Sequence, residues 1–341
     1  MSSDSRVSSP GQLLTDADIP PVPDDQVVVP DGSLAALAAQ YNLRPSAQRP
    51  VIGKYLRELA RRWSFIMGFA TARNIAMYTE AKLGQLWQVL APMLNAGVYF
   101  LIFGLLLHIS RGVLNYPAFL VTGVFVFSFT QRTFISTSKV ITDSLPLIRA
   151  LQFPRAALPL AYVMIELQQM LLSMAVLLVI VVATGEPVTW YWLLVVPALG
   201  LQIMFNAGIA LFAARIGARV NDFAQLLPFL MRTWLYLSGV LFSIAGLTAY
   251  ITQRWAVLLL QINPASVYIT LMRNALLASL RMQAPGSKPF NAALCSKTSI
   301  AYCHATLSSP TLWYLGAGWA VVALLGGFMF FWRKEVFYGR G

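Results

Sequence analysis

Few residues in this 341-residue chain have the types and spacing that chemistry requires. The two histidines, His108 and His304, have no acids or cysteines beside them at the spacing of a metal site. The sequence also lacks the G-x-x-x-x-G-K-S/T loop through which many proteins bind ATP. We therefore predict no catalytic residue, no metal site and no cofactor bound by this chain.

Two ionisable residues, Glu166 and Arg232, stand inside long apolar segments. Each lies roughly eight or nine residues from the same end of its segment, and an unpaired charge in a bilayer costs several kcal/mol, so we predict that the two side chains pair. A proton or ion relay is one interpretation, and a structural ion pair or hydration in a pore is the other. A relay normally uses a chain of carboxylates, which favours the structural interpretation.

Aromatic residues are concentrated in the first two apolar segments, where they could line a path for sugars. Phe125 and Phe129 are four apart and therefore share one face of a helix. The apolar faces of sugar rings stack on aromatic rings, but packing in the core or against lipid is the commoner use of such residues. The candidate lining residues, including two from the fifth segment, are Tyr99, Phe103, Phe125, Phe129, Arg232 and Tyr236.

The composition identifies an integral membrane protein. Hydrophobic residues make up 57% of the chain and charged residues only 11%, whereas a soluble domain is about half apolar and a quarter charged. The formal net charge is +12. Lysine and arginine collect on the cytoplasmic flanks of membrane spans, which explains this excess better than binding to nucleic acid does.

The N-terminal region differs from the rest. Residues 1–50 contain six aspartates, several prolines and only short apolar pieces, so we predict a disordered cytosolic arm there and one membrane domain over 51–341. The segment 54–78 has an amphipathic pattern that predicts a helix in the plane of the membrane interface; a helix packed on a soluble partner is the alternative. Its expected apolar face consists of Leu56, Leu59, Trp63, Ile66 and Ala70.

Six segments are long and apolar enough to span a membrane, for which about 20 residues are needed. With the N-terminus inside, the inner segments contain 18 of the 25 lysines and arginines. We therefore predict an all-α, multi-pass protein of the plasma (inner) membrane with both termini in the cytosol. The predicted spans are 87–109, 117–135, 157–184, 190–214, 224–245 and 311–332.

The outer segment 246–310 contains two short apolar stretches, 255–262 and 266–280, separated by Asn263 and Pro264. Neither is a good span, and the second carries Arg273, so we predict two re-entrant helices with a stop and restart between them. The only cysteines, Cys295 and Cys303, also fall in this segment. An oxidising exterior permits a disulfide between them, and two free thiols are the alternative.

Five blocks of sequence resemble the permeases of ABC-2 polysaccharide exporters, the class that exports O-antigen and teichoic acid. The resemblance extends over residues 54–335. One departure is Asn221-Asp222, where the family usually has Arg-Asp; the fold expectation is unaffected. The blocks are AKLGQLWQVLAPMLNAGVYFLIFG (81–104), YPAFLVTGVFVFSF (116–129), LIRALQFPRAALPLA (147–161), ARIGARVNDFAQLLPFLMRTWLYLSGVLF (214–242) and INPASVYITLMRNALL (262–277).

This resemblance implies a homodimer of six-span permeases that works with two copies of a separate ABC ATPase, which would bind ATP and Mg²⁺. It implies a continuous channel for a polyprenyl-diphosphate-linked glycan and an outer gate that would include Asn263, Pro264 and Arg273. The stretch 146–155 would be a cytosolic coupling helix seated in a groove of the ATPase; a loop that binds lipid headgroups is the alternative. Its expected contact residues are Arg149, Gln152, Phe153, Pro154 and Arg155.

Within the family, the acidic leader and the overall sequence look most like the mycobacterial-type exporter of lipid-linked cell-wall galactan. Two other classes remain as alternatives. A stand-alone secondary flippase of lipid-linked glycans would need charged relay residues in several spans, and the chain offers Glu166 and Arg232. A membrane glycan ligase would need acids or histidines outside, where Glu186 is the one acid available.

Overall fold

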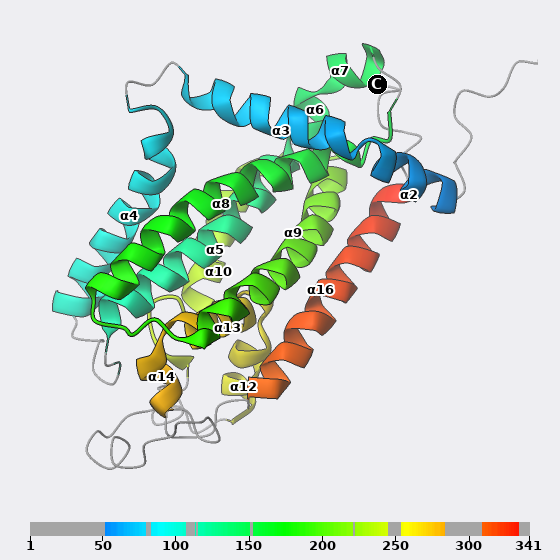
Figure 1. Cartoon of the computed structure of the whole chain (residues 1–341). Helices are drawn as coiled ribbons and strands as arrows, with labels where there is room; N and C mark the ends of the chain where they lie inside the picture. Colours follow the sequence, from blue (N-terminus) through cyan, green and yellow to red (C-terminus); the bar gives the residue numbers. More distant parts are fainter. Residues whose placement is uncertain are drawn as a thin grey trace, which may run out of the picture. The chain divides into compact units, whose positions relative to one another are not determined.

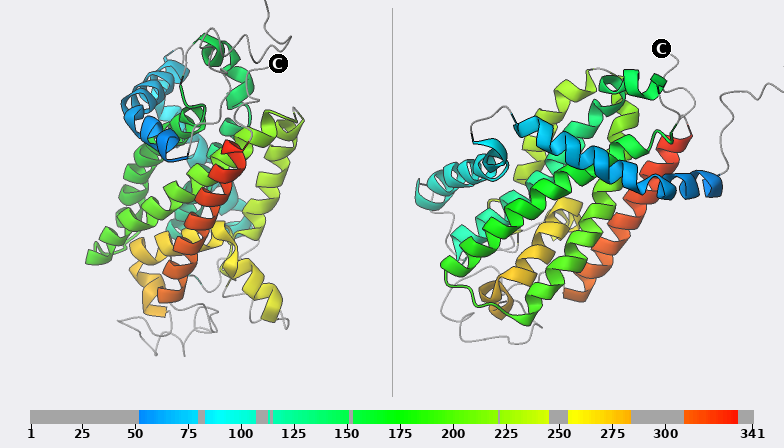
Figure 2. Two further views of the ribbon diagram at one scale, coloured as in Figure 1. Left: turned by 90° about the vertical axis from the view of Figure 1, so that its right-hand side faces the viewer. Right: turned by 45° about the horizontal axis from the view of Figure 1, so that its top comes forward.

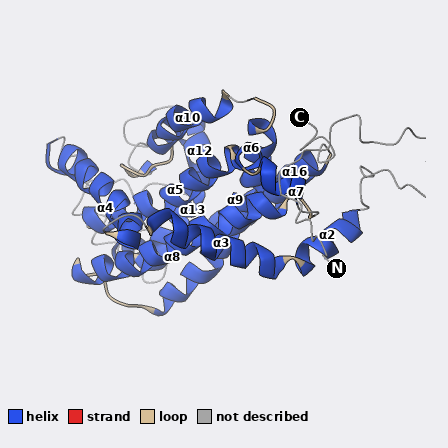
Figure 3. Ribbon diagram, turned by 90° about the horizontal axis from the view of Figure 1, so that it is seen from above, coloured by secondary structure: helices blue, strands red, loops and turns tan. Residues whose placement is uncertain are grey.

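The computed structural model describes residues 52–79, 83–106, 113, 115–150, 153–220, 222–244, 254–283 and 309–333. The predicted arm 1–50, Gln152, Cys295 and Cys303 lie outside the described residues, as does the side chain of Arg149. Every element of regular structure in the described part of the chain is a helix (Figure 3). The expected all-α fold is therefore confirmed.

Five helices of the described ranges are long and apolar enough to cross a membrane, and all five coincide with predicted spans. Figure 1 shows them as a bundle of steeply inclined helices. The first continues without interruption from an α-helix into a π-helical stretch, and the fourth begins with a 3-10 turn. They comprise α4 (Trp87–Tyr99) with η4 (Phe100–Leu106), α5 (Tyr116–Ser138), α8 (Ala157–Ala183), η5 (Trp190–Leu194) with α9 (Val195–Gly217), and α16 (Ser309–Trp332).

The predicted span 224–245 is wrong in its length. The helix found there, α10 (Phe223–Leu237), has 15 residues and is therefore about 22 Å long at 1.5 Å per residue. A bilayer core is about 30 Å thick, so α10 alone does not cross it. The helix ends just before Gly239, whose φ of 65° is a left-handed conformation that glycine adopts without strain.

A bent pair of helices, α12 (Arg254–Ile262) and α13 (Pro264–Leu276), follows α10. The two axes meet at 73°, as expected for a re-entrant loop or a broken span. The break has a local cause, because a residue before proline is driven out of helical geometry. Asn263 accordingly has φ −49° and ψ 124°, and its side chain caps the new helix by accepting a hydrogen bond from the N–H of Ala265.

Two helices cross one end of the bundle: α2 (Ile52–Arg61) and α3 (Trp63–Tyr78) (Figure 2). We call this the α3 end and the opposite one, where α14 (Ala278–Gln283) lies, the α14 end. The predicted apolar face was partly wrong, because Leu56 and Trp63 are about half exposed. The stripe that faces the bundle consists of Tyr55, Leu59, Ile66, Ala70 and Asn74.

The core is organised around α5, which packs against α4, α8, α9, α10 and α13. The helices α9 and α16 approach each other closely at Gly208 and Gly327. A Cβ atom at either position would collide with the backbone of the facing helix. Small elements complete the described chain: η3 (Gly84–Leu86), α6 (Val140–Asp143) and α7 (Leu145–Ala150).

Candidate functional site

The buried carboxylate of Glu166 has a different partner from the one predicted. Its Oε2 lies 3.1 Å from the Nε of Arg132 on α5, whereas Arg232 is exposed on α10. The predicted Glu166–Arg232 pair is therefore wrong. Arg132 lies within the predicted span 117–135 but was not considered as a partner of Glu166. In the structure Arg132 is on α5, which packs against α8, the helix that carries Glu166.

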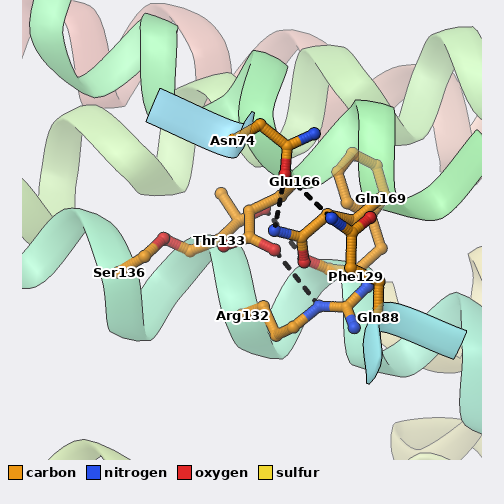
Figure 4. A network of polar contacts seen from close by, with 8 residues as sticks. All are labelled: Asn74, Gln88, Phe129, Arg132, Thr133, Ser136, Glu166 and Gln169. Carbon is orange, nitrogen blue, oxygen red and sulfur yellow. Dashed lines mark hydrogen bonds and ion pairs between the residues drawn. The ribbon is translucent and has the colours of Figure 1, made fainter. Parts of the chain in front are cut away.

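Beside this ion pair, amide side chains form a polar network (Figure 4). The Oδ1 of Asn74 on α3 accepts hydrogen bonds from Gln88 on α4, at 3.0 Å, and from Gln169 on α8, at 3.5 Å. The Nδ2 of Asn74 donates to Gln168, at 3.0 Å, and Gln168 donates in turn to Thr71, at 3.0 Å. The network thus joins the crossing helix α3 to two spans.

Tyr78, at the end of α3, lies close to both charges of the network. Burial raises the pKa of its hydroxyl, the nearby Arg132 opposes this shift, and Glu166 adds to it. A proton relay would need a chain of carboxylates, whereas the other members of this network are amide side chains and a threonine. The arrangement favours a mechanical link between α3 and the spans over proton transfer.

The predicted coupling stretch lies at the α3 end, where it contacts the crossing helices. The ring of Phe153 is 5.5 Å from that of Phe65, Pro154 is buried, and the N–H of Ala156 donates to the Tyr55 hydroxyl at 3.2 Å. Phe153 and Pro154 are therefore engaged in packing within the chain. The part of this stretch that projects from the bundle is α7, with Pro146 exposed (Figure 1).

The prediction that Phe125 and Phe129 line a channel is wrong for this structure. Phe125 and Phe129 are 1% and 0% exposed and belong to the main hydrophobic core. The face of α5 that carries the two rings is covered by neighbouring helices, so this pair of rings cannot line an open path.

The other candidates gather where α4 and α10 both pack on α5. Tyr99 and Phe103 are half-buried, with ring centroids 6.4 Å apart. The hydroxyl of Tyr99 lies within electrostatic reach of Arg232 and Tyr236 on α10, and Tyr236 is 44% exposed. The structure therefore brings an exposed guanidinium and two phenol groups together at one side of the bundle.

The predicted gate residues have well-defined contacts. The indole N–H of Trp234 on α10 donates to the Oδ1 of Asn263 at 2.8 Å, and the Nδ2 of Asn263 donates to the carbonyl of Leu237 at 3.2 Å. Pro264 is the first residue of α13, a position where its missing N–H costs nothing. Asn263 thus joins three elements: α10, α12 and α13.

Arg273 is an internal anchor. It is buried, and it donates to the carbonyls of Phe119 at 3.1 Å, Gly239 at 2.8 Å and Val240 at 2.8 Å. Its guanidinium carbon also lies 3.3 Å from the centroid of the Phe119 ring, a cation–π geometry. A Cβ atom at Gly123 would collide with its Nη2, so the guanidinium occupies space that the glycine leaves.

Sequence reasoning missed the role of Glu186, which it noted as a lone acid of the outer loops. Its buried carboxylate accepts hydrogen bonds from the N–H of Ser279, at 3.1 Å, from the Ser279 hydroxyl, and from the Nδ2 of Asn115, at 3.2 Å. Asn115 also caps α5. Glu186 therefore fixes α14 to the start of α5, a role that only its placement reveals.

Comparison with known proteins identifies the family. Residues 66–277, more than half of the chain, match the model of the ABC-2 type transporter family. The chain belongs to this family. Its members are membrane transporters, and the five long apolar helices fit that assignment.

This ABC-2 family member has relatives among polysaccharide export proteins. It is 24% identical over 192 residues to the O-antigen export system permease protein RfbA of Myxococcus xanthus, covering 56% of this chain and 73% of the relative. It is 26% identical over 168 residues to the protein of the same name from Klebsiella pneumoniae, covering 49% and 64%. It is 26% identical over 206 residues to the polysialic acid transport protein KpsM of Escherichia coli, covering 59% and 76%. The expected family is confirmed.

Proposed function

We propose that this chain is the permease subunit of an ABC exporter that moves a polyprenyl-diphosphate-linked polysaccharide, cell-wall galactan in the narrowest form of the proposal, out of the cytosol. It would act as a homodimer with two copies of a separate ATPase that binds ATP and Mg²⁺. The family and the names of three relatives, two for O-antigen export and one for polysialic acid transport, support this role.

The observation that carries the proposal is the exposed Arg232 on an apolar side of the bundle. Its neighbours on α10 include Phe229, which is 71% exposed, and Leu237, and α4 presents Leu94 and Leu101. Apolar side chains can face lipid, but a guanidinium at membrane depth must face water or another polypeptide. A second copy of this chain would cover the apolar residues and leave Arg232, Tyr99 and Tyr236 beside a hydrated path.

The distribution of basic residues supports a cytosolic α3 end. Helices α2 and α3 carry several lysines and arginines, and α7, the projecting part of the predicted coupling stretch, lies at the same end (Figure 1). The positive-inside rule then places this end in the cytosol and the α14 end outside, in the plasma (inner) membrane. The chain termini would both be cytosolic.

Coupling to the ATPase provides the first experiment. The ATPase surface that meets Arg155 is expected to be acidic, so Arg155→Glu would place like charges across the interface. This variant should abolish export and reduce the amount of ATPase that co-purifies. Arg155→Gln separates the loss of a contact within the chain from repulsion across the interface. Arg219→Glu, an exposed reversal at the same end, is the matched control. Unchanged ATPase binding and export in Arg155→Glu would exclude the coupling role of this turn.

The energy source and the cargo are tested by export from reconstituted vesicles. With lipid-linked galactan as the probe, export should require both the ATPase and ATP, and should be insensitive to collapse of the proton gradient. Export that continues without the ATPase but stops with the gradient would support a stand-alone flippase instead. Export of another lipid-linked glycan but not of galactan would support the permease role and contradict the proposed cargo.

A further inference from the structure

The two helices of the bent pair differ sharply in how firmly they are held. In α13, ten of the 13 residues are buried, and its Tyr268 hydroxyl donates to the carbonyl of Gly316 on α16 at 2.9 Å. In α12, Trp255 and Leu259 are 63% and 62% exposed, and Val257 is the one buried residue of the range 255–262. Helices with few buried contacts belong to the least stable parts of a fold, those that open first.

Polar anchors at the far end of α13 increase this difference. Arg273, in the last turn of α13, is bonded to three backbone carbonyls of α5 and the turn after α10. The next helix, α14, is tied through Ser279 to Glu186. Displacing α13 and α14 would therefore leave a buried guanidinium and a buried carboxylate without partners, which is strongly unfavourable. No comparable anchor holds the body of α12 within the described residues.

Two indole groups hold the junction between the helices. Trp234 of α10 donates to the side chain of Asn263, and Trp319 of α16 donates to the carbonyl of Ile262, both at 2.8 Å. The carbonyl of Ile262 belongs to the last turn of α12, where no helical partner is available for it. The two tryptophans therefore bond to the end of α12 from two different helices.

We infer that Asn263 and Pro264 form a pivot, that α12 is the moving arm of the outer closure, and that α13 with α14 is its fixed wall. Trp234 and Trp319 are positioning residues that set the resting angle of α12. Figure 2 shows α12 (yellow) diverging from α13 (orange) toward the edge of the bundle. Rotation about a few backbone bonds at a helix terminus is the usual form of a hinge.

The position of Trp234 links this arm to the exposed side of the bundle. The same helix carries Arg232 and Tyr236 on its exposed face and Trp234 on the face that meets Asn263. A shift of α10 would therefore act on the junction directly through the indole N–H. The role of α12 in closing the outer end rests on the proposed function, whereas the difference in mobility between α12 and α13 does not.

Amide hydrogen exchange on the full chain in lipid nanodiscs tests the mechanical claim. Amides of 255–262 should exchange at least about tenfold faster than those of 266–276, as expected for a segment that opens locally. Trp234→Phe and Trp319→Phe keep an aromatic ring but remove the donor, and each should accelerate exchange in α12 while leaving α13 unchanged. Trp313→Phe, which removes an indole from the core-packed side of α16, is the matched control and should affect neither helix.

Equal exchange in α12 and α13, or equal acceleration of both by Trp234→Phe, would overturn the inference. A leak assay adds the functional readout: proteoliposomes with Trp234→Phe should lose K⁺ faster than those with the unmodified chain or with Trp313→Phe, and an unchanged leak would remove α12 from the closure. Fast exchange in α12 combined with no export of any glycan would refute the proposed function and leave the hinge standing. Normal export together with slow exchange in α12 would support the proposed function and refute the hinge.

Discussion

Two arginines inside the bundle, Arg132 near the α3 end and Arg273 near the α14 end, are stabilised by different means. Arg132 is half-buried and forms an ion pair with Glu166, beside a network of amide side chains from three helices. Arg273 is buried, and it is bonded to three backbone carbonyls and stacked over Phe119. One solution uses side chains, and the other uses the backbone.

This difference determines what each site can organise. Replacing both members of an ion pair with apolar residues is often tolerated, because neither charge is left alone. A cage of carbonyls cannot be replaced in this way, since the carbonyls belong to the chain and need a donor when buried. Arg273 therefore fixes the positions of the start of α5, the turn at 239–240 and α13 relative to one another. The ion pair links helices whose packing is already determined by their apolar faces.

The largest effect should come from removing Arg273. Arg273→Met removes the guanidinium donor from the carbonyls of Phe119, Gly239 and Val240. It should lower the free energy of unfolding by about 3–5 kcal/mol, since each buried hydrogen bond to a charged group contributes about 1.5–3 kcal/mol. Arg273→Lys should recover less than half of this loss, because an ammonium group cannot reach three carbonyls in the geometry of a guanidinium. Thermal unfolding in detergent measures both. Arg232→Met is the control, an exposed arginine whose loss should have little effect; equal losses at the two arginines would refute the anchor.

Two double-mutant cycles distinguish the Glu166–Arg132 pair from the Glu166–Arg232 pair that the sequence predicted. Glu166→Gln and Arg132→Met should each cost about 2–4 kcal/mol, and their combination should cost less than the sum, because removing both charges leaves neither unpaired. The same cycle with Arg232→Met in place of Arg132→Met should be additive within about 0.5 kcal/mol. Coupling in the Arg232 cycle, with additivity in the Arg132 cycle, would reverse the assignment.

Gly123 provides a sharper test of the carbonyl cage. Gly123→Ala puts a methyl group where the Nη2 of Arg273 lies and should cost about 1–3 kcal/mol, the usual cost of overpacking. In the Arg273→Met background most of this cost should disappear, since the colliding group is gone. The comparison of the four unfolding temperatures measures this coupling, and a penalty that persists in full would mean that the alanine collides with something other than the guanidinium.

The smallest effect is expected at Glu186, where an acceptor is weakened but not removed. Glu186→Gln keeps one oxygen for the N–H of Ser279 and should cost about 1 kcal/mol, the net value of one hydrogen bond. Ser279→Ala removes the matching hydroxyl and should cost a similar amount. Amide exchange should rise in α14 in both variants and stay unchanged in α3; a rise confined to α3 would contradict the role of Glu186 at the α14 end.

Signals that are local in the chain could be read from the sequence. Five spans were predicted to within a few residues, because a long apolar stretch requires a lipid environment wherever it packs. The break at Asn263 and Pro264 was predicted because the steric restriction before proline acts between adjacent residues. The family was also recognisable, since its blocks occur in order along the chain.

Relations between distant segments were decided only by the tertiary structure. The partner of Glu166 depends on α8 lying beside α5, and nothing in either segment encodes that neighbour. Phe125 and Phe129 share a helical face, but whether that face meets a channel or a core depends on the helices that cover α5. Arg273 could be placed in the outer segment from the sequence, whereas its carbonyl partners come from positions 119, 239 and 240. Hydrophobic patterning specifies that a helix is buried, and only packing specifies against what, because the bilayer and the protein core are equally apolar surroundings for the same side chains.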